Sequence, residues 1–194
     1  HRAIPPRPEG RGFPRNRMTD QTATPALPAA REDFEAVSEI LQDLAKRHYA
    51  AHGSASQAPA LVAVLCRTQM EGKPVVKLIP VDFLQSEEAG DRGKDLIAIL
   101  LRQLAGHDDT LVVGYTSEAW MTSNQGIQPS ADPERKEVVV LNLMSAECQA
   151  RQVCPLTRSA TGVTLETGEL QFMKGETQLK GRFARNPTND QPLH

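Results

Sequence analysis

Residues 111–123 constrain the fold more than any other stretch, because their apolar and aromatic side chains follow one another as in a β-strand. This segment contains the single Trp of the chain and one of its two Tyr. A polar loop separates it from a second apolar strand, residues 138–141. If the two strands pair, they gather four charged or aromatic residues: Glu118, Trp120, Arg135 and Glu137.

Two other segments carry the three- and four-residue spacing of amphipathic helices, and each is followed by a glycine that can end a helix. The first predicted helix spans residues 31–52, and its apolar stripe is Phe34, Val37, Ile40, Leu41, Leu44 and Ala45. The second spans residues 94–105, and its apolar face is Leu96, Ile97, Leu100, Leu101 and Leu104.

The remaining apolar segments predict strands. Residues 60–66 form a continuous apolar run, and residues 74–81 return after a turn, which predicts a hairpin. Residues 149–157 predict a strand that lies at a sheet edge or is broken at Pro155. Residues 163–166 and 169–173 predict a last hairpin around Gly168. This order predicts an α+β fold: a single domain with a mostly antiparallel sheet and two main helices.

The ends of the chain differ from this domain. Residues 1–29 are rich in Arg and Pro, so we expect a disordered N-terminal arm; residues 30–184 form the single α+β domain, and residues 185–194 form a disordered tail. Residues 1–17 hold five Arg against one Glu, a net charge of +4. Their composition suggests that Met18 is the natural start and that residues 1–17 are translated upstream or appended sequence.

Composition narrows the functional classes. A net charge of −2 and a pI near 6.2 argue against nucleic-acid binding except through the basic residues 1–17. No apolar run approaches the roughly 18 residues of a membrane span, so we expect no membrane partner. The three Cys form no CxxC motif, which suggests reduced thiols and a cytoplasmic location.

Glu118 and Glu137 are the candidate catalytic residues, because two carboxylates can serve as general acid and base. On an alternating strand Glu118 shares a face with Trp120, and an apolar wall can raise the pKa of a carboxyl group. The alternative is structural: Glu118 pairs with Arg135, Lys136 or Arg182, and Trp120 packs.

We expect neither a metal site nor a cofactor. His48 and His52 are four residues apart in the first helix, but no third ligand accompanies them, and two His in a last turn suit the helix dipole. Phosphate-binding, dinucleotide-binding and nucleophile-elbow motifs are missing from the sequence.

Three motifs resemble a widespread group of uncharacterised bacterial and phage-encoded proteins. They are Thr-Ser-Glu-Ala-Trp-Met at 116–121, Pro-Ser at 129–130 with Asp-Pro-Glu-Arg-Lys-Glu-Val-Val-Val at 132–140, and Gly-Arg-Phe-Ala at 181–184. The likeness covers residues 94–184 well. It implies a small cytosolic α+β protein and transfers no catalytic residue. It adds weight to Trp120, Arg135 and Arg182 as binding residues beside Glu118 and Glu137.

Three functional hypotheses follow. The first is a cytosolic protein of bacterial or phage-related origin that acts by binding a partner or a small ligand. The second is a small hydrolase or nuclease-like enzyme that uses Glu118 and Glu137, with or without a divalent metal. The third is a nucleic-acid accessory protein that uses residues 1–17. The predicted edge at 149–157 also suggests a homodimer.

Overall fold

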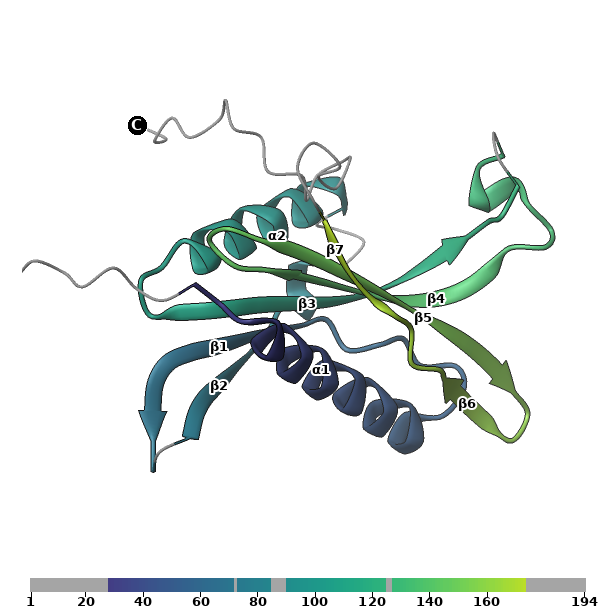
Figure 1. Ribbon diagram of the computed structural model, residues 1–194. Helices are drawn as coiled ribbons and strands as arrows, with labels where there is room; N and C mark the ends of the chain where they lie inside the picture. Colours follow the sequence, from purple (N-terminus) through teal and green to yellow (C-terminus); the bar gives the residue numbers. More distant parts are fainter. Residues whose placement is uncertain (1–27, 72, 85–89, 125–126, 174–194) are drawn as a thin grey trace, which may run out of the picture.

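The computed structural model of the protein describes residues 28–71, 73–84, 90–124 and 127–173 (Figure 1). Over these residues the fold is α+β, as predicted, with an antiparallel sheet and two α-helices. The helices are α1 (Arg31–His52) and α2 (Gly90–Ala105), and two short 3-10 turns are η1 (Asp82–Leu84) and η2 (Pro129–Ala131). The strands are β1 (Leu61–Met70), β2 (Lys73–Pro80), β3 (Thr110–Met121), β4 (Lys136–Met144), β5 (Gln149–Ser159), β6 (Gly162–Leu165) and β7 (Leu170–Met173).

The sheet has the strand order β2-β1-β3-β4-β5-β6, and β7 pairs with β5 beside β6. The predicted hairpin of β1 and β2 and the predicted pairing of β3 with β4 are both confirmed. Residues 1–27 of the predicted arm, residues 174–184 of the predicted domain with Arg182, and the predicted tail lie outside the described residues.

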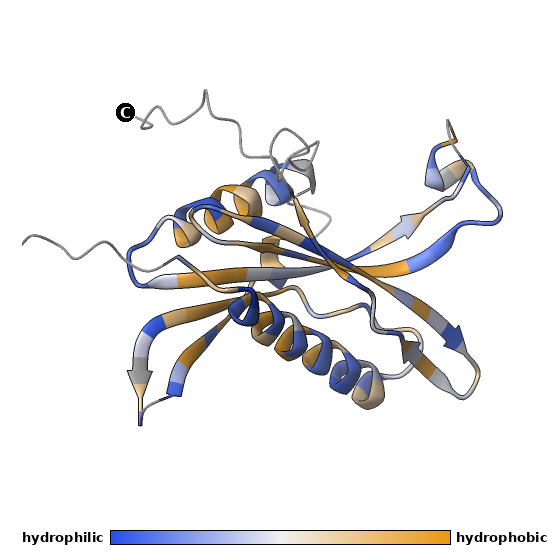
Figure 2. Cartoon of the chain, viewed as in Figure 1, coloured by the Kyte–Doolittle hydropathy of each residue, from blue (hydrophilic) through white to orange (hydrophobic). Residues whose placement is uncertain are grey.

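The two helices cover opposite faces of the sheet, so the domain has two cores (Figure 1). Because side chains alternate along β3, Val112 packs under α1 while Val113 packs under α2. Figure 2 shows both helices with mixed hydrophilic and hydrophobic residues and the middle of the sheet mainly hydrophobic. Within the described residues, no helix combines the length and the hydrophobicity that a membrane span requires.

Helix α1 begins and ends where the sequence predicts. Glu32 and Asp33 lie in its first turn, where negative charge is favourable, and Asp33 accepts a hydrogen bond from the Ala30 amide at 2.7 Å. Gly53 ends the helix with φ +80°, and its amide donates to the Tyr49 carbonyl at 2.9 Å. The helix lies close to β3 because Gly114 has no side chain: a Cβ there would lie 2.7 Å from Val37.

Helix α2 differs from its prediction in two respects. It begins at Gly90, four residues before the predicted start. Its covered face is Ile97, Ala98, Leu101 and Ala105, while Leu96 is 42% exposed. The sequence pattern predicts that every Leu of this helix is buried, but only a narrow stripe of side chains faces the sheet.

Strand β5 corrects the prediction of an edge or broken strand. It pairs with β4 on one side and with β6 and β7 on the other. Pro155 lies opposite Val138, at the point where the second neighbour of β5 changes from β7 to β6. A proline is tolerated there because its missing N–H breaks no ladder on that side. The predicted dimer edge at 149–157 is therefore occupied within the chain.

Strands β6 and β7 also differ from the prediction, since they pair with β5 and not with each other as a hairpin. The chain passes from one to the other close against β5. A Cβ at Gly168 would lie 1.8 Å from the Val153 carbonyl oxygen, so only glycine fits there.

Candidate functional site

The predicted charged and aromatic residues of β3 and β4 lie on the same face of the sheet. Trp120 lies directly opposite Glu137, and Glu118 lies opposite Val139. Val139 packs in the core under α1, so Glu118, Trp120 and Glu137 face the α1 side of the sheet. The structure thus brings together the two candidate catalytic carboxylates.

Arg158 of β5 lies between these carboxylates and binds both. Its Nε donates to the Glu137 oxygens at 2.9 and 3.0 Å, and its Nη2 donates to the Glu118 oxygens at 3.1 Å. Its Nη1 donates to the backbone carbonyls of Ser54 and Ser56 at 2.6 and 2.7 Å. The side chains of Arg158, Glu118 and Glu137 are 23, 17 and 18% exposed, so this is a largely covered ion-pair cluster. We call it the Arg158 cluster.

Glu118 receives two further hydrogen bonds. Tyr49 of α1 donates its hydroxyl to Glu118 Oε1 at 2.6 Å, and the Ala58 amide donates to the same oxygen. Burial and then the hydrogen bond to Glu118 raise the pKa of Tyr49, so the phenol remains a donor. One oxygen of Glu118 thus accepts from three donors, and the cluster ties α1 and the loop after it to β3, β4 and β5.

The expected ion-pair partner of Glu118 is therefore corrected. The sequence suggested Arg135, Lys136 or Arg182, whereas the partner in the structure is Arg158. Strand alternation could have found it, because Arg158 shares a face with Cys154 and Leu156 of the core under α1. The prediction missed Arg158 because it ended the strand at Thr157.

Trp120 and Arg135 are also brought together, at the end of the β3–β4 ribbon. The guanidinium carbon of Arg135 lies 4.4 Å from the centre of the Trp120 ring, which is a cation–π contact. Trp120 is 48% exposed. Met121 and Ile127 are exposed to a similar degree, 44 and 45%, at the same end of the ribbon. We call Trp120, Met121, Ile127 and Arg135 the ribbon tip.

Asp132 holds the loop of the ribbon tip. Its carboxylate accepts hydrogen bonds from the Thr122 hydroxyl, the Asn124 amide group at 3.0 Å and the Glu134 backbone amide at 2.9 Å. Asp132 is 2% exposed, because its own loop covers it. The hydrogen bond from Thr122 and those from the other donors lower the pKa of Asp132. Figure 1 shows this loop, with η2, at the far end of the ribbon and away from both helices.

His48 and His52 do lie on the same side of α1, with ring centres 4.3 Å apart. His52 Nδ1 lies 3.0 Å from the His48 carbonyl oxygen, so this ring nitrogen is engaged in a hydrogen bond to the backbone of its own helix. The described residues contain no group of three or more His, Cys, Asp or Glu that could hold a metal ion. Cys66, Cys148 and Cys154 are free thiols, and burial raises the pKa of the thiols of Cys148 and Cys154.

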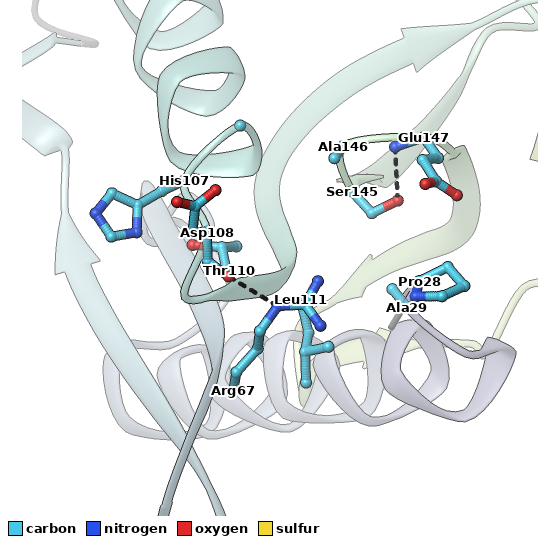
Figure 3. A pocket seen from close by; sticks show the side chains of 11 residues that line it. Pro28, Ala29, Arg67, His107, Asp108, Thr110, Leu111, Ser145, Ala146 and Glu147 are labelled. Carbon is cyan, nitrogen blue, oxygen red and sulfur yellow. Dashed lines mark hydrogen bonds between the residues drawn. The ribbon is translucent and has the colours of Figure 1, made fainter. Parts of the chain in front are cut away.

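A small hollow lies between the start of α1, the turn before β3 and the turn between β4 and β5 (Figure 3). Its volume is about 180 Å³, below the roughly 300–1,000 Å³ of pockets for larger ligands. Arg67, His107, Asp108 and Glu147 contribute side chains to it, and Arg67 Nε donates to the Asp108 carbonyl at 2.8 Å. None of the predicted site residues lines this hollow.

No protein-family model, curated protein or solved structure matches the chain. What the protein does is therefore inferred from its own side chains.

Proposed function

We propose that this protein is a cytoplasmic binding protein of bacterial or phage-related origin, and that the ribbon tip contacts a partner protein. The observation that supports this proposal most is the exposed Trp120 with Arg135 stacked on it, at the end of a ribbon that extends beyond both helices. Trp, Met and Arg are enriched in the buried centres of protein interfaces.

The loop geometry adds a second reason. An interface gains affinity when its contact residues are ordered before binding, because less conformational entropy is lost. Through its three donors, Asp132 ties residues 122–124 to residue 134, close in the chain to Trp120. A partner would therefore meet a preformed aromatic and cationic surface.

The hydrolase alternative has less support. A general acid or base must exchange a proton with a substrate, whereas the oxygens of Glu118 and Glu137 are already occupied by Arg158 and, for Glu118, by Tyr49 and Ala58. An arginine bound to two carboxylates and two carbonyls is typical of a structural ion-pair network. The nucleic-acid alternative depends on residues 1–17, which lie outside the described residues.

The experiment that tests the proposal is site-specific photo-cross-linking from the ribbon tip. A benzophenone amino acid at Met121 should capture a protein from a lysate of the source cells, and the same group at Leu96, which is equally exposed on α2, should not. The captured protein is then purified and its Kd measured by calorimetry. We expect Trp120→Ala to weaken binding at least tenfold, and Arg135→Ala to weaken it less.

Thermal unfolding of the two variants separates binding from folding. Because Trp120 is half exposed, Trp120→Ala should melt within a few degrees of the parent. A purified partner that binds Trp120→Ala as tightly as the parent, or adducts that form equally from both positions, would refute the proposal.

A further inference from the structure

Strand β5 carries two partly buried arginines on opposite faces of the sheet, and they differ in their partners. Arg158 on the α1 side binds two carboxylates. Arg151 pairs with Asn142 of β4 on the α2 side, and its Nε donates to the Asn142 Oδ1 at 3.3 Å. Among the residues that the structure describes, no carboxylate pairs with Arg151.

The environment of Arg151 is costly for a cation. Burial lowers the pKa of Arg151, and no neighbouring charge contributes to the shift. A guanidinium that is removed from water without a counter-charge is unfavourable, so partly buried arginines normally bind carboxylate or phosphate. The two Nη groups of Arg151 and the Asn142 amide group remain as donors toward such a group.

A neighbouring side chain is also unsatisfied. Gln149 lies two residues before Arg151 on the same strand and therefore on the same face of the sheet. It is only 8% exposed, and its Oε1 has no hydrogen-bond partner within the described part of the chain. Buried polar atoms nearly always have a hydrogen-bond partner. This face of the sheet therefore lacks both a donor for Gln149 Oε1 and an anion for Arg151.

We propose that Arg151, with Asn142 and Gln149, forms a binding site for a small oxyanion, a carboxylate or phosphate group that also carries a hydrogen-bond donor. The planar guanidinium binds two oxygens of the anion, the Asn142 amide group adds a third donor, and Gln149 Oε1 accepts from the ligand. This site lies on the α2 side of the sheet. It is separate from the Arg158 cluster and does not depend on the proposed role of the ribbon tip.

Thermal unfolding of the full chain in inorganic phosphate or in glycolate, a carboxylate that carries a hydroxyl donor, tests the site, with ionic strength held constant by NaCl. At about ten times the Kd, linkage predicts a rise of roughly 3–6 °C in the melting temperature. Arg151→Gln should abolish the rise, whereas Arg102→Gln, which removes an exposed arginine of α2, should preserve it. A rise with phosphate alone identifies a phosphate group, and a similar rise with glycolate identifies a carboxylate.

The unliganded variants give a second measurement. Arg151→Gln should melt no lower than the parent, because it removes a charge that has no counter-charge. Asn142→Asp places a carboxylate beside Arg151 and should both raise the melting temperature and remove the response to anions.

Three results would each overturn the proposal. They are an unchanged anion response in Arg151→Gln, no response of the parent to either anion, and a markedly lower melting temperature of unliganded Arg151→Gln. The last would show that the guanidinium stabilises the fold without any ligand.

Discussion

At the scale of single residues, Arg158 has the largest predicted effect on stability. Arg158→Met leaves Glu118 and Glu137 partly buried without their counter-charge, so the free energy of unfolding should fall by about 3 kcal/mol or more. Arg47→Met is the matched control, because Arg47 pairs with Asp43 in solvent and should contribute less than about 1 kcal/mol. Urea unfolding measures both values.

The same measurement can separate lost attraction from stranded charge. Adding Glu118→Gln and Glu137→Gln to Arg158→Met removes the unpaired carboxylates and should recover much of the lost stability. Equal losses in Arg158→Met and Arg47→Met would show that the Arg158 cluster does not stabilise the fold.

The lowered pKa of Asp132 predicts that the structure of the ribbon tip depends on pH. Its pKa is lower in the folded protein than the ordinary 3.8, so its hydrogen bonds contribute stability above that value. This contribution is lost as the pH falls below 3.8 through the lower pKa of the folded state. Trp120 is the single tryptophan of the chain, so its fluorescence reports on the loop directly.

The emission of Trp120 should therefore change in acid while far-UV circular dichroism still shows a folded sheet. Asp132→Asn is the control, since it removes the titrating group and should flatten this transition. An identical acid transition in Asp132→Asn would assign the change to another carboxylate.

At the scale of elements, α2 offers two leucines that the sequence could not tell apart. Both were predicted to be buried, but Leu101 is 2% exposed and Leu96 is 42% exposed. Leu101→Asp buries an unpaired carboxylate and should cost more than about 4 kcal/mol, enough to unfold many domains of this size.

Leu96→Asp should change the free energy of unfolding by less than about 1 kcal/mol, because its side chain reaches solvent. Urea unfolding of the two variants compares them directly. Similar losses would mean that Leu96 is covered in solution.

The elements also show where sequence reasoning succeeds. Helix α1 has the predicted bounds and β4 contains the predicted apolar run, residues 138–141, because helical spacing and an uninterrupted apolar run are properties of neighbouring residues. The edge at β5 and the last hairpin were wrong, because strand partners depend on residues far apart in the chain. The close approach of Gly168 to β5, which fixes the path from β6 to β7, is a contact between distant residues and cannot be predicted from neighbouring ones.

In the candidate site, too, residues close together in the chain could be predicted and those from distant segments could not. Glu118, Trp120 and Glu137 could be grouped from the sequence because they lie on two consecutive strands. Arg158 was missed because the predicted strand ended one residue before it, at Thr157, and its partners in the fold come from four other segments. Asp132 appeared only as part of a polar turn, because no periodic pattern marks a loop carboxylate that binds its own backbone.

At the scale of the whole molecule, β5 contributes an arginine to each face of the sheet. One of its arginines completes an ion-pair network, and the other provides the proposed anion site. The ribbon tip lies at the end of strands β3 and β4, of which only β4 pairs with β5. Binding at the tip and binding at Arg151 can therefore be tested independently, since each relies on side chains that the other does not use.

The position of Arg158 in the chain also affects how the protein is made. Arg158 bonds to the Ser54 carbonyl across 104 residues, which a ribosome takes roughly 5–20 s to add. During that time Tyr49 and the apolar face of α1 have left the exit tunnel without the strand that completes their packing. Strands β1, β3 and β4 can pack on α1 before then, but Glu118 and Glu137 have no counter-charge until the end of β5 emerges, and a holding chaperone would have its longest opportunity to bind the incomplete domain in that interval.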